Sequence, residues 1–352
     1  MYMQNFRNLH QATGRFITVE NINYLFAGGT AYLGLLTNPQ YTELYKKGID
    51  IYGLNNGTSR TNNIQLGIYD EAEEYLANRF LFDSAALLSS GYLAAQVVVK
   101  TFANNNPVFY APDTHPSLWL TENPNHTQDF KIWANDVIER INQSLDDEFV
   151  IVANALDNLT PRRYDFSVFN KIDSSKKILL ILDDSHGIGV LKKDRVSIDV
   201  SKMGSNIEVL VLASLAKGLG TDAGVILGNK ERIVKIKNHP IFIGASPANP
   251  AALYAMVNAG DIYEYAYHKL HQNILQFEAL IRSYPLKNIP KFPVFTSIDP
   301  NLYQYLISKR VLISSFPYPL ATSSLLNRIV ISAVHEKEDI QKIAELLTIG
   351  GH

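Results

Sequence analysis

The chain has 352 residues, of which 46% are hydrophobic and 19% are charged, a composition typical of a globular protein with a large core. Its formal net charge of -2 gives no electrostatic case for binding nucleic acid or an anionic membrane. The absence of cysteine excludes disulfides, thiolate nucleophiles and cysteine-ligated metal sites. Residues 1–16 lack a signal-peptide core and no apolar run spans a bilayer, so we expect a cytoplasmic protein without a membrane span.

Between about Tyr75 and Gly228, short apolar segments alternate with amphipathic ones, which indicates a mostly parallel sheet flanked by helices. The expected fold class is therefore α/β. The predicted strands are Ala85–Leu88, Val108–Tyr110, Phe149–Ala153, Ile178–Leu182, Val209–Ala213 and Gly224–Leu227. The predicted helices are Glu71–Arg79, Tyr92–Phe102, Ile132–Gln143 and Ala251–Asn273.

A proline-marked stretch from Tyr284 to Pro293 indicates a joint. The β-α-β-β-α pattern beyond it predicts a small C-terminal α/β domain. We expect an N-terminal segment (1–45) that packs with the small domain, a large domain (46–250), and a linking helix with the small domain (251–352). The predicted elements of the small domain are Val294–Thr296, Leu302–Ser308, Val311–Ser314, Arg328–Ser332 and Glu336–Leu347.

The first candidate for chemistry is Lys217, which follows a predicted buried strand in the run Ala-Ser-Leu-Ala-Lys-Gly-Leu-Gly. Ligands of open α/β sheets bind at the carboxyl ends of the strands, which is where this lysine falls. Partial desolvation there lowers the pKa of a lysine and lets its amine form an imine. Taken alone, a solvated loop lysine is the more common explanation.

The second candidate is the Asp183-Asp184-Ser185-His186 run, which follows the apolar strand Ile178–Leu182. A carboxylate at such a strand end can keep a pyridinium nitrogen protonated, which makes the ring an electron sink. The alternatives are an aspartate-rich turn and an Asp/His metal site. No His-Glu-x-x-His or other metal-ligand spacing supports a metal.

Two further strand ends carry candidate groups. Ser90, Gly91 and Tyr92 open a predicted helix, where free amides and the helix dipole can hold a phosphate, although a serine N-cap explains the same residues. His115 follows the strand Val108–Tyr110 and can stack on a planar ring, with a capped loop histidine as the alternative. The sequence has neither the phosphate-binding loop of nucleoside-triphosphate-binding proteins nor the Gly-x-Ser-x-Gly elbow of serine hydrolases.

The order and spacing of these motifs resemble the α-oxoamine synthases, a family within the PLP (pyridoxal 5'-phosphate) dependent aminotransferase class I and II superfamily. Its members include 8-amino-7-oxononanoate synthase and 2-amino-3-ketobutyrate CoA ligase. The resemblance runs from about Tyr32 to the C-terminus and also rests on the run from Ala31 to Leu35, on Thr58-Ser59-Arg60, and on the run from Arg328 to His335. It implies the fold type I of PLP-dependent transferases, a homodimer, and the condensation of an amino acid with acyl-CoA or another acyl thioester.

The resemblance also implies roles for individual residues. Lys217 would bind the cofactor as an internal aldimine and later move protons at the substrate Cα. Asp183 would pair with the pyridinium nitrogen, His186 would contact the phenolic-oxygen side of the ring, and His115 would stack on its face. Arg328 would bind the carboxylate of the amino acid. The phosphate would be held by Ser90, Gly91, Tyr92 and Ser214, and by Ser246 across the dimer.

The chain departs from the family pattern at two places that bear on the reaction. Ala31 stands where the family has a substrate-contacting asparagine, and the segment from Ala155 to Asn158 replaces Ser-Met-Asp-Gly. These departures leave other reactions of the fold open, namely transamination and the cleavage of a β-hydroxy amino acid. A non-catalytic protein that keeps the PLP fold for binding is the third alternative.

Overall fold

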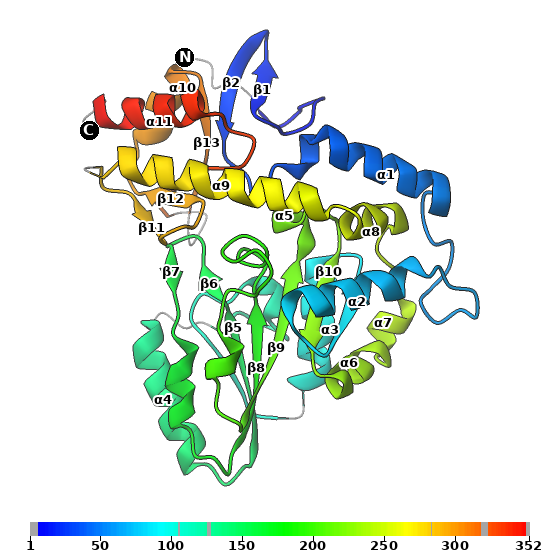
Figure 1. Ribbon diagram of the computed structural model, residues 1–352. Helices are drawn as coiled ribbons and strands as arrows, with labels where there is room; N and C mark the ends of the chain where they lie inside the picture. The colour runs from blue at the N-terminus through cyan, green and yellow to red at the C-terminus, as the bar shows by residue number, and fades with distance from the viewer. Residues whose placement is uncertain (1–5, 105, 125–127, 283, 318–322, 350–352) are drawn as a thin grey trace.

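The computed structural model describes residues 6–104, 106–124, 128–282, 284–317 and 323–349. Its larger body is built on a six-stranded sheet in which only β10 runs against its neighbours, so the sheet is mostly parallel, as predicted (Figure 1). The order across this sheet is β3 (Ser84–Leu88), β10 (Gly224–Gly228), β9 (Ile207–Ser214), β8 (Lys177–Asp183), β5 (Glu148–Asn154) and β4 (Val108–Tyr110).

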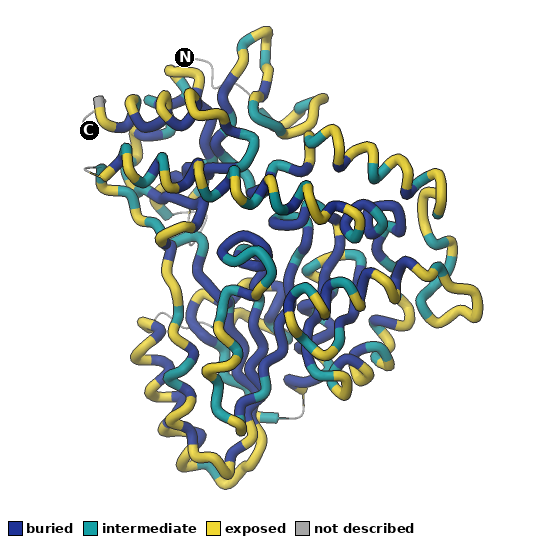
Figure 2. Tube along the Cα trace, in the orientation of Figure 1, coloured by how far each residue is buried: buried dark blue, intermediate teal, exposed yellow. Residues whose placement is uncertain are grey.

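Alternate residues of the central strands face opposite layers, because successive side chains of a strand point to opposite sides. In β8, Leu179 and Ile181 belong to one buried cluster, whereas Leu180 and Leu182 belong to the other. Both faces of the sheet are therefore covered. Figure 2 shows the strands in the middle of this sheet in dark blue, the colour of buried residues. The helices of this body are α2 (Ile68–Phe80), α3 (Gly91–Phe102), α4 (Phe130–Gln143), α5 (Leu215–Gly218), α6 (Lys230–Lys237), α7 (Pro240–Gly244) and α8 (Pro250–Val257).

A second six-stranded sheet combines the two ends of the chain. Its strand β2 pairs in parallel with β13, with Leu25 opposite Val311. The order across this sheet is β1 (Phe16–Val19), β2 (Ile22–Ala27), β13 (Val311–Pro317), β14 (Leu325–Val330), β12 (Val294–Ser297) and β11 (Lys287–Asn288). The other α-helices are α1 (Pro39–Tyr52), α9 (Gly260–Leu280), α10 (Leu302–Ser308) and α11 (Lys337–Ile349), and β6 (Leu156–Asp157) and β7 (Arg162–Arg163) form a hairpin. Short 3-10 helices cover Leu35–Thr37, Pro116–Leu118, Phe166–Lys171 and Val200–Lys202.

The long helix α9 runs from the larger body to the second sheet and packs against α11 (Figure 1). The helix α1 packs against α8, and Gly48 allows this approach because a Cβ there would come within 2.7 Å of the carbonyl oxygen of Ala251. The first 45 residues therefore contribute both to the second sheet and to a helix that contacts the larger body. The predicted division at residues 46 and 251 stays a prediction.

Most predicted elements are present with ends that differ by up to three residues, and two differences can be traced to particular contacts. The single helix expected over Ala251–Asn273 is wrong, because the chain forms α8 and α9 with a break at Asn258 and Ala259, where the Asn258 side chain bonds back to the carbonyl of Tyr254. The strand expected over Arg328–Ser332 begins earlier, at Leu325, and ends at Val330. It ends there because the amide of Ser332 donates to Nδ1 of His335 and closes a turn.

Candidate functional site

A small cavity of about 30 Å³ lies at the carboxyl ends of the parallel strands of the larger sheet. Parallel neighbours end at the same edge, and ligands of such sheets bind there. Four of the predicted site residues, Lys217, Asp183, His186 and His115, line this cavity together with Asn154, Leu156, Asn158 and Ser185. The strand ends therefore bring three of the predicted motifs together at one place.

The ends of β8 and β9 are held together by a short chain of hydrogen bonds. The amide of Ser185 donates to Oδ1 of Asp183 over 2.9 Å, and the amide of Ser214 donates to Oγ of Ser185 over 2.8 Å. The Asp183 carboxylate is thus fixed at the cavity wall through Oδ1, and none of the described residues donates a hydrogen bond to its Oδ2. Ser214 precedes the single turn of α5, which carries Lys217 beside it.

Lys217 is partly buried, and burial is the main cause that lowers the pKa of its amine. The charge of Arg328 lowers this pKa further, whereas the charge of Asp183 raises it. A lowered pKa increases the fraction of neutral amine near pH 7, and only the neutral amine attacks a carbonyl group.

The loop that carries His115 is held at the cavity by the end of β5, a position for which the sequence analysis predicted no role. The side chain of Asn154, the last residue of β5, accepts from the amide of His115 and donates to the carbonyl of Asp113 over 2.6 Å. The ring nitrogen Nδ1 accepts from the amide of Ser117, so the proton of the neutral ring lies on Nε2. Desolvation, followed by the charge of Lys217, lowers the pKa of His115, while Asp183 opposes the shift.

His186 and Arg328 come from different sheets and meet through Tyr32. The Tyr32 hydroxyl lies 2.8 Å from Nδ1 of His186, and the nearby Arg328 guanidinium lowers the pKa of this hydroxyl against the larger effect of burial. Arg328 lies in β14 and is only 6% exposed, yet its Nε and one terminal nitrogen have no hydrogen-bond partner among the described residues. Buried donors of this kind are rare without a ligand, and a guanidinium fork fits a carboxylate.

The start of α3 packs tightly against the segment before Lys217. A Cβ placed on Gly91 would lie 2.5 Å from Cβ of Ser214, so only glycine fits at this position. The Ser90 side chain caps the amide of Leu93, and the amides of Gly91 and Tyr92 have no partner within the first turn of the helix. Free amides at the start of a helix can hold a phosphate, and Ser214, which Gly91 contacts, lies three residues before Lys217.

The cavity lining does not include the remaining predicted site residues, which are Ser90, Gly91, Tyr92, Ser214, Arg328 and Ser246. Ser246 has no described contact with the cavity residues. It is exposed in the connection between α7 and α8. Its predicted role requires a second subunit and stays a prediction, as do the roles of the other site residues. The sequence analysis gave no role to Tyr32 or Asn154. Asn154 could have been found from its place at the end of a strand, whereas no local signal connects Tyr32 to His186.

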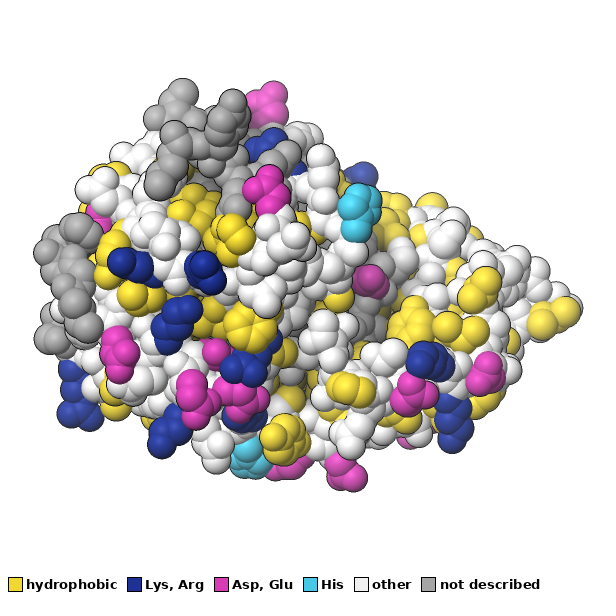
Figure 3. Space-filling model, turned by 90° about the horizontal axis from the view of Figure 1, so that it is seen from above, with side chains coloured by type: hydrophobic (Ala, Val, Ile, Leu, Met, Phe, Trp, Pro, Cys, Tyr) yellow, Lys and Arg dark blue, Asp and Glu magenta, His cyan; other side chains and the backbone are white. Residues whose placement is uncertain are grey.

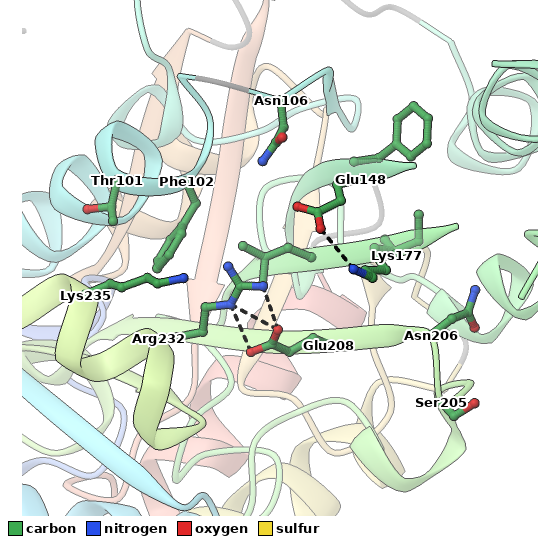
Figure 4. A pocket seen from close by; sticks show the side chains of 13 residues that line it. Thr101, Phe102, Asn106, Glu148, Lys177, Ser205, Asn206, Glu208, Arg232 and Lys235 are labelled. Carbon is green, nitrogen blue, oxygen red and sulfur yellow. Dashed lines mark hydrogen bonds and ion pairs between the residues drawn. The ribbon is translucent and has the colours of Figure 1, made fainter. Parts of the chain in front are cut away.

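A larger cavity of about 520 Å³ lies at the other end of the same strands and does not include any predicted site residue (Figure 4). Its charged walls are already paired, since Arg232 bonds Glu208 and Lys177 bonds Glu148 (Figure 4). Volume alone therefore does not locate the chemistry. The described residues contain no group of three or more His, Asp or Glu side chains that could hold a metal ion. None of the described helices has both the length and the apolar character needed to cross a membrane.

The family model "Aminotransferase class I and II" matches residues 30–347. The chain belongs to this family. Among curated relatives, 8-amino-7-oxononanoate synthase of Fervidobacterium nodosum is 24% identical over 358 residues, which cover 96% of this chain and 90% of the relative. The Buchnera aphidicola protein of the same name is 25% identical over 362 residues, which cover 94% of this chain and 90% of the relative.

Solved structures show the same fold. Sphingomonas wittichii serine palmitoyltransferase superposes with a TM-score of 0.83 at 15% identity, covering 98% of this chain and 91% of that protein. The Francisella tularensis 8-amino-7-oxononanoate synthase gives a TM-score of 0.68 at 18% identity, covering 93% and 97%. Together with the sequence relatives, these likenesses confirm the expected fold class and the resemblance to the α-oxoamine synthases.

The residues around the cavity fit PLP. The glycine-lined cradle at the start of α3 suits its phosphate, the Asp183 carboxylate suits its ring nitrogen, and the amine of Lys217 suits its aldehyde. The unpartnered donors of Arg328 suit the carboxylate of an amino acid beside it. PLP is also the cofactor expected from the family to which the chain belongs.

Proposed function

We propose that this protein is a PLP-dependent acyltransferase that joins an amino acid to the acyl group of a thioester. The C–S bond of the thioester and the bond from Cα to the carboxylate break, and a bond from Cα to the acyl carbon forms. The products are an α-amino ketone, carbon dioxide and a free thiol. The observation that carries the proposal is the buried guanidinium of Arg328, two of whose nitrogens have no hydrogen-bond partner among the described residues and whose charge acts on Lys217, because it supplies an anchor for an amino acid.

The chain's own residues have separable tasks in this reaction. Arg328 binds the carboxylate and thereby orients the amino acid. Lys217 removes and returns the proton at Cα, a task for which its lowered pKa suits it. Asp183 would keep a pyridinium nitrogen protonated, and His115 and His186 would contact the cofactor ring. When bound, PLP supplies the electron sink that makes Cα acidic.

The test of the cofactor site uses the purified full-length protein. We expect a visible absorbance band from lysine-bound PLP, and we expect Lys217→Ala to remove it. Lys192→Ala is the matched control, because Lys192 is a partly buried lysine that bonds the carbonyl of Ile198 and does not line the cavity. A band that persists in Lys217→Ala contradicts the proposal.

The reaction itself is tested by incubation with a panel of amino acids and acyl-CoA. Release of free thiol together with carbon dioxide supports condensation. Transamination is the second candidate, and Ala31 favours it because the family's asparagine is missing there. It requires amino transfer to a 2-oxo acid without thiol release, so the two reactions give different products in the same assay.

We further propose that the protein acts as a homodimer in which Ser246 reaches the partner's phosphate site. Large apolar side chains are exposed at the end of α1 and in the connection after it, with Ile51, Leu54 and Ile64 exposed by 52%, 71% and 72%. The space-filling view also shows apolar side chains toward the end of the molecule where this connection lies, while positive and negative side chains are interspersed elsewhere on that face (Figure 3). Exposed apolar patches of this kind are typical of interfaces. Sedimentation velocity of wild type and Leu54→Glu tests the dimer.

A further inference from the structure

Tyr32 lies where three parts of the chain meet at the candidate site. It follows β2, is fully buried, and accepts a hydrogen bond from the amide of Ala333, which follows β14. Its ring packs against Phe292 at 5.9 Å between centroids and against His186 at 6.2 Å. The backbone and the ring of Tyr32 therefore fix its position independently of its hydroxyl.

The hydroxyl of Tyr32 has two polar neighbours, Nδ1 of His186 and the guanidinium of Arg328. Burial raises the pKa of Tyr32 to about 12 against the opposing charge of Arg328, so the phenol keeps its proton at neutral pH. A buried hydroxyl proton needs an acceptor, and a guanidinium has only donors. Among the described contacts of this hydroxyl, Nδ1 of His186 is the acceptor that remains.

The direction of this hydrogen bond decides the tautomer of His186. Burial, with the positive charges of Lys217 and Arg328, lowers the pKa of His186 well below its ordinary value, so the ring is neutral. A neutral imidazole has a single N–H group. Because Nδ1 accepts from Tyr32, this N–H is on Nε2.

We propose that Tyr32 is a positioning residue that fixes His186 in the Nε2–H tautomer and holds the Arg328 guanidinium at the same point. The inference rests on the proposed function, in which His186 faces the phenolic oxygen of PLP and Arg328 binds the amino acid. An oxygen that carries negative charge requires a donor, and Tyr32 ensures that the free ring nitrogen of His186 is one. The same hydroxyl links the donor for the cofactor to the anchor for the substrate.

The direct test is nitrogen NMR of the full-length protein labelled with ¹⁵N-histidine, with bound PLP and again after its removal. His186→Gln identifies the His186 signals. We expect a protonated Nε2 and an unprotonated Nδ1 in the wild type under both conditions. In Tyr32→Phe, which loses only the hydroxyl, we expect both signals to move toward intermediate values as the tautomers mix.

The matched control is Tyr69→Phe, which removes another buried hydroxyl, one that bonds the carbonyl of Ala248 over 3.0 Å. It should leave the His186 signals unchanged. A wild-type spectrum with the proton on Nδ1 overturns the proposal without any variant. Unchanged His186 signals in Tyr32→Phe overturn it as well.

A second measurement follows the binding of the amino acid substrate. The dissociation constant for the amino acid, measured from the visible band, should rise about tenfold in Tyr32→Phe, because the buried guanidinium of Arg328 loses its polar neighbour. Loss of the band in the wild type refutes the proposed cofactor site, whereas the NMR of cofactor-free protein still decides the role of Tyr32. An unchanged dissociation constant contradicts the part of the proposal that concerns Arg328.

Discussion

The side-chain oxygen of Asn154 lies 3.1 Å from the amide nitrogen of His115, which joins the end of a central strand to the loop that carries an imidazole. We expect Asn154→Ala to release this loop, because it also removes the bond to the carbonyl of Asp113. Each bond contributes about 1 kcal/mol, so the affinity for PLP should fall about tenfold. Titration with PLP measures it. Asn142→Ala is the control, since Asn142 makes the same two kinds of bond far from the cavity.

Gly91→Ala should weaken PLP binding at least tenfold, because the added methyl group would meet both Cβ and Cα of Ser214 and push the cradle away from Lys217. The comparison is Gly260→Ala, the first residue of α9, where a Cβ has open space. Equilibrium dialysis of PLP with both variants gives the measurement. Equal affinities would show that the start of α3 takes no part in the site.

The rate at which cofactor-free protein forms its visible band with PLP should rise with pH, because only the neutral amine of Lys217 reacts. The charge of Arg328 lowers the pKa of Lys217, so Arg328→Gln should raise this pKa and move the rate profile to higher pH. Arg195→Gln, at an exposed position, should leave the profile in place. Stopped-flow absorbance across the pH range tests the direction of the shift.

Asp184 makes folding stability depend on pH with an unusual sign. Burial, opposed by hydrogen bonds from Ser197, raises the pKa of Asp184 from 3.8 to about 7. The unfolded chain therefore ionises first, and stability from this group is lost as pH rises from about 4 to about 7. Asp184→Asn should gain on the order of 4 kcal/mol over the wild type above pH 7 but nothing near pH 4. Urea unfolding at several pH values measures the gain, and a pH-independent difference contradicts it.

Glu73→Ala should lower the free energy of unfolding by about 3 to 5 kcal/mol, because it removes the buried carboxylate that pairs with Arg60 and Lys237 and leaves Arg60 only its pair with the exposed Asp70. The Glu73 side chain also accepts from the amide of Leu87 in β3. Glu74→Ala, at the exposed next position, is expected to change stability by less than about 0.5 kcal/mol. Denaturant unfolding of both variants makes the comparison.

The sequence predicted those parts of the site that depend on local patterns. Apolar runs located the strands, and the edge of a parallel sheet then brings Lys217, Asp183 and His115 together without further information. The family and fold class, which rested on the order of these motifs, are confirmed. The contact between Tyr32 and His186 joins residues 154 positions apart, and such a contact leaves no periodic or local signal.

The differences in the secondary structure have the same origin. The apolar pattern of Ala251–Asn273 is continuous, so it predicts one helix, whereas the break at Asn258 is decided by a side-chain bond and by packing of α8 against α1. Similarly, the strand β14 ends at Val330 through the turn that His335 closes. Tertiary contacts overrule a local pattern at each of these points.

The pairing of β2 with β13 has a consequence for synthesis on the ribosome. Leu25 leaves the ribosome early but must wait for Val311 before its strand has a neighbour on that side. Arg328, which belongs to the adjacent strand, emerges later still. The larger sheet can thus assemble while the chain is being made, whereas Tyr32 and Arg328 can meet only after residue 328 has left the ribosome. Long-range pairing of this kind slows folding, so we expect site assembly to be the last event in the maturation of this protein.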